Sequence, residues 1–486
     1  MSQHEVFERA RKSRDTRFDG QFYIGVRTTG IYCRPICPAN PPKSENVTFF
    51  PTAAAASEAG YRPCLRCRPE CAPGTPAWTG TSATVRRGLR LIANGALDDG
   101  SIEDLATRLG VTSRHLRRLF TRHLGASPLA VAHTQRLHFA KQLIDQTRLP
   151  MQDIAVAAGY GSIRRFNDSF VKTYGRPPRE LRRAARTPDA EGTGTALTVR
   201  LPCRMPFDWP ALLEFFAARA TPGVESVDGD RYLRTVTVNG RPGVIEVRQG
   251  AGSVLLTMHG ISTPNIFAVV QRCRELFDLD APIQEITAVL SRDAVLGPLL
   301  RGNPGIRVPG AWDGFELAVR AILGQQVSVK AATTVAGRIA GAYGEPAQNQ
   351  GFSALTHLFP KPGRLARARF TNMGITRARA ATLRRLARAV LDGALSFDTS
   401  RDPAAFRESL LAIPGIGEWT AQYVTMRALK NPDAFPAADL GLLRAFDRPE
   451  RPRLRPAQLE EMSQAWRPWR AYAALLLWGS APGSGG

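Results

Sequence analysis

The sequence predicts a multidomain α+β protein, and three patterns along its 486 residues indicate this fold class. Two close pairs of cysteines near the start predict a small zinc-stabilised α/β domain. Two similar helical units follow, which predict an all-α region. The second half begins with strand-like segments, which predict a small antiparallel sheet domain, and continues as a long helical region. A chain of this length holds three or more domains of ordinary size, and its hydrophobic content of 43% gives each a core.

The charge balance indicates a polyanionic partner. Lys and Arg number 65 against 42 Asp and Glu, a formal net charge of +23, which favours nucleic acid. A ribosomal or membrane-surface protein is the alternative, but no basic tail or basic amphipathic helix dominates. No apolar run approaches the roughly 20 residues that span a bilayer, and the N-terminus lacks the apolar core of a signal peptide. We therefore expect a cytoplasmic protein with reduced thiols and no membrane partner.

The cysteines of residues 1–75 predict a metal site. Cys33 and Cys37 form one close pair, and Cys64 and Cys67 form another. Four thiolates in two such pairs suit tetrahedral Zn²⁺; disulfides are the alternative, against which the expected compartment argues. Cys71 falls outside the spacing. Residues 22–38 alternate apolar and polar side chains, which predicts a strand leading into the first pair.

This region resembles the zinc domain of Ada-type adaptive-response regulators through two sequence motifs, G-I-Y-C-R-P-I-C and R-P-C-L-R-C. The resemblance implies that Cys33 accepts a methyl group from a methylated DNA phosphate, once and irreversibly. A zinc-bound thiol is deprotonated at neutral pH and is a nucleophile. Methylation makes the site one unit less negative, which lowers its repulsion from DNA. A merely structural zinc is the alternative.

Residues 82–186 carry two helix-turn-helix patterns. In the first, Ser101 is an expected N-cap with Asp104 three residues on, and Gly110 makes the turn. In the second, Gly159 makes the turn. The second helix of each unit is basic and would enter the major groove of double-stranded DNA; its expected DNA-binding residues are Arg114, His115 and Arg117 in one unit and Arg164 and Arg165 in the other. A generic bundle with solvated arginines is the alternative. The pair resembles the AraC-type DNA-binding domain, and if the chain is an activator, RNA polymerase is a further partner.

The second half is predicted to begin after a flexible linker at 187–195. Four strand-like segments and a helical run lie in residues 196–282, and residues 283–480 are mostly helical. Within the helical region, Pro414-Gly415-Ile416-Gly417 lies between two expected helices. Two glycines one residue apart allow a tight turn whose bare backbone, at the start of the next helix, binds a DNA phosphate. This is the pattern of a helix-hairpin-helix, although a plain helix-to-helix turn is the alternative.

Asp439 follows the second of these helices. A carboxylate beside a bound phosphate backbone repels it, so its presence favours chemistry on a sugar. From Leu197 to Gly479 the chain resembles the AlkA-type branch of the helix-hairpin-helix DNA glycosylases, through L-P-C-R-M-P-F-D-W, F-E-L-A-V-R-A-I-L-G-Q-Q-V-S-V, the hairpin and W-R-P-W-R-A-Y-A-A-L-L-L-W.

This second resemblance implies that Asp439 is catalytic and that Trp419, Tyr423 and Trp478 line the site of the flipped base. Trp419 stands where strand-cutting relatives carry a lysine, which implies a monofunctional enzyme. Gln326 lies at the position of the inserted wedge, and its polar side chain departs from the usual apolar one. Trp312, Trp466 and Trp469 are expected in the core.

The sequence therefore predicts a bacterial alkylation-damage protein of the nucleoid. It would combine methyl-phosphotriester sensing, transcription regulation and excision of alkylated purines of the 3-methyladenine type by N-glycosidic hydrolysis. The alternatives are a regulator whose glycosylase-like half is an inert DNA clamp, and a glycosylase that uses its front half for scanning. No P-C-H-R cysteine motif occurs, so repair of O6-methylguanine is not expected.

Overall fold

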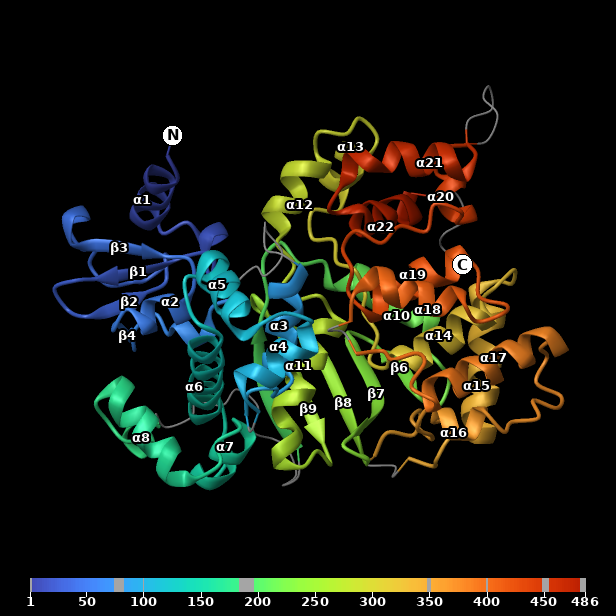
Figure 1. Ribbon diagram of the computed structural model, residues 1–486, viewed down its shortest axis with the longest axis horizontal. Helices are drawn as coiled ribbons and strands as arrows, with labels where there is room; N and C mark the ends of the chain where they lie inside the picture. The colour runs from blue at the N-terminus through green and yellow to red at the C-terminus, as the bar shows by residue number, and fades with distance from the viewer. Residues whose placement is uncertain are drawn as a thin grey trace. The chain divides into compact units, whose positions relative to one another are not determined.

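The computed structural model describes residues 2–73, 83–98, 100–182, 196–347, 351–398, 401–447 and 454–480 (Figure 1). The chain divides into two compact units. The first comprises Met1–Arg204, Gly250–Gln271 and Leu279–Pro282, and the second comprises Met205–Gln249, Arg272–Asp278 and Ile283–Gly486. The predicted linker at 187–195 lies outside the described residues, and the predicted domain limits stay predictions. Within the described ranges, no helix is long and apolar enough to cross a membrane.

The first unit begins with a four-stranded sheet in the order β3-β1-β2-β4. β1 pairs antiparallel with β2 and β3, and β2 pairs parallel with β4. The elements of this region are α1 (Gln3–Ser13), η1 (Thr16–Phe18), β1 (Tyr23–Val26), β2 (Ile31–Cys33), η2 (Ser44–Asn46), β3 (Val47–Phe50), α2 (Ala53–Glu58), β4 (Arg62–Pro63) and η3 (Pro69–Cys71). The sheet places the end of β2 beside the end of β4, where the two cysteine pairs lie.

The single strand predicted over residues 22–38 is wrong, because the structure has a β-hairpin there. The amide of Gly30 donates to the carbonyl of Val26 at 2.9 Å, and Gly30 has a φ of +63°. This is the left-handed conformation that glycine adopts at little cost. The run Arg27-Thr28-Thr29-Gly30 has no apolar side chain, and this break in the alternation marks the reversal.

The helical part of the first unit contains two helix-turn-helix pairs, α4–α5 and α7–α8, joined by the long helix α6 (Figure 1). The expected capping box of Ser101 with Asp104 is present, Thr112 caps α5 and Ser162 caps α8. Gly110 and Gly159 have φ values of +71° and +74° in the two turns. The bounds are α3 (Ala83–Ala93), α4 (Ile102–Leu109), α5 (Ser113–Leu124), α6 (Pro128–Gln146), α7 (Met151–Ala157), α8 (Ile163–Tyr174) and α9 (Pro178–Leu181).

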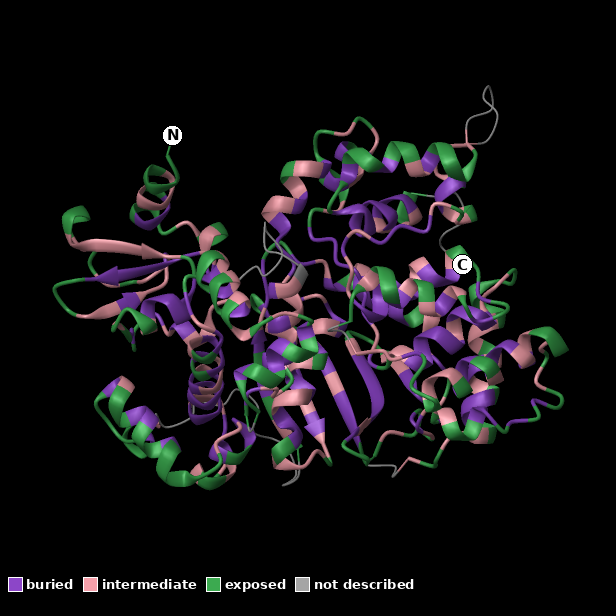
Figure 2. Cartoon of the chain, viewed as in Figure 1, coloured by how far each residue is buried: buried purple, intermediate pink, exposed green. Residues whose placement is uncertain are grey.

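Strands β5 to β9 form one small sheet. β5 pairs antiparallel with β9, and β7 pairs antiparallel with both β6 and β8. The four predicted strands are present, and β6, with the polar sequence E-S-V-D, was missed. Figure 2 shows that most of β7 is buried. The bounds are β5 (Ala196–Pro202), α10 (Trp209–Arg219), β6 (Glu225–Asp228), β7 (Arg231–Val238), β8 (Arg241–Gly250), β9 (Ser253–His259), η4 (Thr263–Asn265) and α11 (Ile266–Leu276).

The rest of the second unit is helical, and its core is built around α14, α17, α18 and α19. Trp312, Trp466 and Trp469 are buried, as expected. The bounds are α12 (Ile283–Leu290), α13 (Leu296–Gly302), α14 (Gly314–Leu323), α15 (Val329–Tyr343), α16 (Pro362–Leu365), α17 (Arg377–Leu391), α18 (Pro403–Leu411), α19 (Glu418–Ala428), α20 (Leu440–Arg444), α21 (Pro456–Ser463), η5 (Gln464–Trp466) and α22 (Arg470–Ser480). The multidomain α+β class with these four kinds of region is confirmed.

Candidate functional site

The turn between α18 and α19 has the predicted hairpin geometry. Gly415 has a φ of +97°, and a β-carbon there would lie 2.0 Å from the Thr382 hydroxyl oxygen of α17. Gly417 is the N-cap of α19 and has no side chain with which to cap it. A β-carbon at Gly417 would meet no atom within 4 Å. The first glycine is therefore required by packing, and the second leaves the helix start open.

Asp439 is the N-cap of α20, and one of its oxygens, Oδ1, accepts the amide of Leu442 at 3.0 Å. The same oxygen accepts the indole N–H of Trp478 at 2.8 Å, and Oδ2 accepts that of Trp419 at 2.6 Å. An ionised carboxylate can accept all of these bonds. The helix start and two indoles thus fix the orientation of one acidic group.

Three aromatic side chains meet at this carboxylate, and we call them the aromatic cluster: Trp419, Tyr423 and Trp478. The rings of Trp419 and Tyr423 stack with centroids 5.4 Å apart and an interplanar angle of 10°. Trp478 meets Tyr423 at 6.2 Å and 63°. All three are partly exposed. The structure therefore brings together the four residues that sequence comparison placed at the base site.

Two arginines beside Tyr423 were missed. Arg427 donates to the hydroxyl of Tyr423 and lies 5.3 Å from its ring centroid, and its other nitrogens donate to the carbonyls of Pro309 and Gly310 at 2.8 Å. Burial raises the pKa of Tyr423, but the charges of Arg427 and Arg219 outweigh it and lower that pKa below the ordinary value. Arg219 comes from α10, far away in sequence; its spacing of four from Phe215 was the available signal, since it lies 4.0 Å over that ring.

Gln326 lies in the short loop between α14 and α15 and is exposed. It has a φ of +56°, which is uncommon for a residue with a side chain. The preceding residue, Gln325, donates from Nε2 to the carbonyl of Gly415 and to the hydroxyl of Thr420, both at 3.0 Å. The loop is therefore attached to the hairpin turn and to the residue that follows Trp419.

The four predicted metal ligands of the first unit form one cluster. The sulfur atoms of Cys33, Cys37, Cys64 and Cys67 all lie within 4.8 Å of one another. Tetrahedral Zn²⁺ with bonds of about 2.3 Å places its sulfurs about 3.8 Å apart, so the cluster fits this ion. Cys64 and Cys67 are buried, whereas Cys33 and Cys37 are partly exposed.

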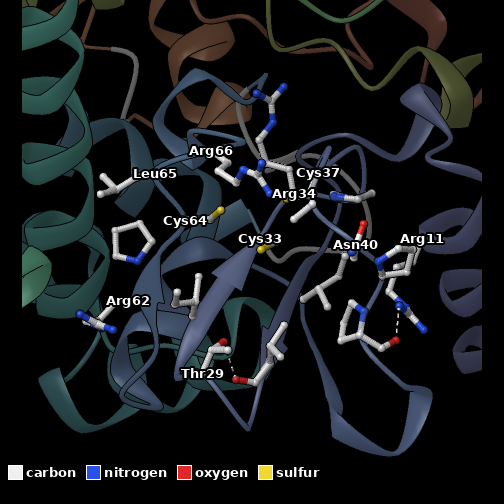
Figure 3. A pocket seen from close by; sticks show the side chains of 18 of the residues that line it. Arg11, Thr29, Cys33, Arg34, Cys37, Asn40, Arg62, Cys64, Leu65 and Arg66 are labelled. Atoms are coloured by element: carbon white, nitrogen blue, oxygen red, sulfur yellow. Dashed lines mark hydrogen bonds between the residues drawn. The ribbon is translucent and has the colours of Figure 1, made fainter. Parts of the chain in front are cut away.

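A pocket of about 570 Å³ opens beside the cluster (Figure 3). Cys33, Cys37 and Cys64 line it, together with Arg62 and Arg66. Arg34 also lines it, but its guanidinium is paired with Asp19 and donates to the carbonyl of Cys67. Arg68, which follows Cys67 in the sequence, forms ion pairs with Glu70 and Asp145. The pocket lining stays cationic, because Arg11, Arg14 and Arg176 also line it.

Residues next to the cysteines in sequence contact α6. The hydroxyl of Tyr32 lies 2.8 Å from Nε2 of His138. Asp145 pairs with Arg68, as noted, and with Lys141. The side chains of Lys141 and Asp145 are only 4% and 3% exposed. The metal region and the helix that joins the two helix-turn-helix pairs thus share a buried polar contact.

The basic residues predicted to meet DNA lie on the outer faces of α5 and α8. Arg114, Arg117, Arg164 and Arg165 are exposed, and His115 is half-buried. The buried faces carry Leu116 and Phe120 in α5 and Phe166 and Phe170 in α8. Each helix therefore has one apolar face for its core and one basic face in solvent.

Comparison with known families gives four matches. The chain matches the metal binding domain of Ada at residues 7–70, a helix-turn-helix domain at 105–184, the AlkA N-terminal domain at 198–313 and the HhH-GPD superfamily of base excision DNA repair proteins at 319–471. With the first match, the four-cysteine cluster is a site for Zn²⁺.

Similar proteins extend this result. A solved structure described as a 3-methyladenine DNA-glycosylase from Archaeoglobus fulgidus covers 58% of the chain and 97% of its own, with a TM-score of 0.51 and 22% identity, and shows the fold of the second half. The DNA-3-methyladenine glycosylase 2 of Escherichia coli is 35% identical over 56% of this chain and 94% of its own. A Mycobacterium tuberculosis protein named "Probable bifunctional transcriptional activator/DNA repair enzyme AlkA" is 42% identical over 98% of this chain and 96% of its own. Since this last similarity runs through all four matched regions, the chain belongs to the family of AlkA-type bifunctional transcriptional activator/DNA repair enzymes.

Proposed function

We propose that the protein senses methylated DNA phosphates, regulates transcription and excises alkylated purines, and that it works at the nucleoid. The observation that carries the enzymatic part is the carboxylate of Asp439, which two indole N–H groups hold against the aromatic cluster. A carboxylate in such a place is suited to stabilising positive charge that develops on a sugar.

In the proposed reaction, a purine alkylated at N3 or N7 already carries a positive charge and is a good leaving group. The bond from C1′ to the base breaks, and its electron pair leaves with the base, which becomes neutral. Asp439 stabilises the sugar cation, and water adds to C1′ while its proton passes to the carboxylate or to solvent. Because Trp419 occupies the place of a lysine nucleophile, the strand is left uncut and the enzyme is monofunctional.

The aromatic cluster receives the flipped base. A cationic purine stacked on electron-rich rings gains about 0.5–2 kcal/mol for each contact. Flipping costs a few kcal/mol and costs least for a damaged base that pairs poorly. Arg427 fixes the ring of Tyr423 through the hydroxyl, so the ring is oriented before the base arrives. Gly415 and Gly417 present backbone amides to a DNA phosphate next to this place.

For the sensing half, we propose Cys33 as the methyl acceptor. Cys33, Cys37, Cys64 and Cys67 would hold Zn²⁺, and binding to it would keep their thiols deprotonated. The sulfur of Cys33 attacks the methyl carbon of a phosphotriester, the carbon–oxygen bond breaks, and the phosphodiester leaves as an anion. A neutral thioether remains, so the site repels DNA less and the helix-turn-helix pairs bind promoter DNA more tightly. RNA polymerase is then the partner that an activator recruits.

The enzymatic proposal is tested with Asp439→Asn. Asparagine also caps helices well, so α20 should keep its start, whereas release of 3-methyladenine from methylated DNA should fall about 100-fold or more. Asp402→Asn is the matched control, because Asp402 caps α18 in the same way and is exposed. Equal release by wild type and Asp439→Asn would leave the second half as an inert DNA clamp.

The sensing proposal is tested by incubating the protein with DNA that carries labelled methyl phosphotriesters. Label should appear on wild type and on Cys71→Ala, whose thiol lies outside the cluster, and not on Cys33→Ala. Peptide mapping of the labelled wild type locates the methyl group without relying on a variant that binds zinc less well. Methyl found on any residue other than Cys33 would contradict the assignment.

A further inference from the structure

The loop that carries Gln326 is strained and held in place. A left-handed backbone at a residue with a side chain costs roughly 1–2 kcal/mol, and Gln326 has a φ of +56°. Arg379 of α17 donates to the carbonyl of Gln325 at 2.5 Å, and the Gln325 amide is bonded to the hairpin. Contacts from three elements thus keep the strained conformation and leave the Gln326 side chain in solvent.

The position of this side chain follows from those contacts. Gln325 touches Gly415, at the turn proposed to bind a phosphate, and Thr420, next to Trp419 of the aromatic cluster. In the proposed complex the damaged nucleotide has its phosphate at the turn and its base against the aromatic cluster. Its flipping leaves a gap in the base stack of the duplex. Gln326 is the next residue along this loop, and its exposed side chain is free of core packing and able to reach that gap.

The chemistry of the side chain identifies its partner. An apolar residue in the gap would supply stacking alone. A primary amide brings two N–H donors and a carbonyl acceptor, and leaving them unpaired inside a base stack costs about 1–3 kcal/mol. The base opposite the gap has just lost its own partner, and its Watson–Crick edge offers a donor and an acceptor side by side. The donors and acceptor of the Gln326 amide therefore complement those of the unpaired base.

We propose that Gln326 hydrogen-bonds the Watson–Crick edge of the base that stood opposite the damaged nucleotide, thymine for an alkylated adenine, and thereby makes binding depend on that base. The inference rests on the proposed glycosylase function and adds to it a specificity-determining residue on the undamaged strand.

The test measures binding to duplexes with a tetrahydrofuran abasic analogue, so that pairing by a lesion does not enter. The opposite position carries either thymine or 2,4-difluorotoluene, which has the same shape and lacks thymine's hydrogen-bonding groups. Wild type should bind the thymine duplex about 2- to 10-fold more tightly, as one or two neutral hydrogen bonds allow. For Gln326→Leu the two dissociation constants should become equal.

Val327→Ala is the matched control, because Val327 is the neighbouring exposed side chain, at 41% exposure. It should lower both affinities together and keep their ratio. A ratio of one for wild type, or an unchanged ratio for Gln326→Leu, would overturn the proposal. The proposed function fails by a different result, equal base release by wild type and Asp439→Asn, so the two failures are distinguishable.

Discussion

At the scale of single residues, His138 shows how burial sets a charge state in the first unit. Its ring nitrogen contacts the hydroxyl of Tyr32, and Glu70, His133 and Lys141 are the ionisable groups that act on it. Burial lowers the pKa of His138 from 6.5 to about 4, so the imidazole is neutral at pH 7. Protonation would place a charge in the contact between the metal region and α6.

The sign of the resulting pH dependence follows from proton counting. Between pH 6.5 and pH 4 the unfolded chain binds a proton at His138 that the folded chain does not, so stability is lost as pH falls. From pH 7 to pH 5 the loss should be about 2 kcal/mol. Denaturant unfolding of wild type and His138→Gln at both pH values isolates the contribution of His138 to the unfolding free energy, since the other groups titrate in both proteins. An identical pH dependence would show that the pKa of His138 is the same in the folded and the unfolded chain.

At the scale of elements, the two glycines of the hairpin turn have different roles: Gly415 is required for packing, and Gly417 is expected to matter for DNA binding. Gly415→Ala should lower the unfolding free energy by about 2 kcal/mol or more, because a left-handed φ and contact with Thr382 both oppose a side chain. Gly417→Ala should change stability by less than about 0.5 kcal/mol and weaken binding to undamaged duplex DNA, since its methyl group would project from exposed backbone. Denaturation and DNA-binding measurements on the pair check this, and equal destabilisation by both would refute it.

Several elements were predictable because their signals are local. Ser101 with Asp104 and the two glycines of the hairpin lie within a few residues of one another, so chain chemistry alone specifies them. The β1–β2 hairpin was missed, although the run Arg27-Thr28-Thr29-Gly30 interrupts the alternation and ends in a turn glycine. The contact of Arg427 and Arg219 with one tyrosine depends on how α10 packs near α19, whereas spacing within α10 indicates only the contact of Arg219 with Phe215. Asp439 was found through family resemblance, while its two indole bonds required the structure.

At the scale of the whole molecule, the metal ligands and the aromatic cluster come from separate parts of the chain. The zinc ligands lie within residues 33–67 of the first unit, and the cluster with Asp439 lies within residues 419–478 of the second. A strong chelator should therefore unfold the metal region, because binding of structural zinc is coupled to folding, and should leave base release within about twofold. Calorimetry and the base-release assay, with zinc-loaded chelator as control, measure both effects. A parallel loss of base release would mean that the second unit needs the metal.

The length of α6 has a consequence for DNA. This helix has 19 residues and joins the α4–α5 pair to the α7–α8 pair, so at 1.5 Å per residue it is a rod of about 28 Å. One turn of B-DNA rises about 34 Å. Since the length of α6 is close to one turn of the duplex, we expect α5 and α8 to reach successive stretches of the major groove on the same side of the DNA.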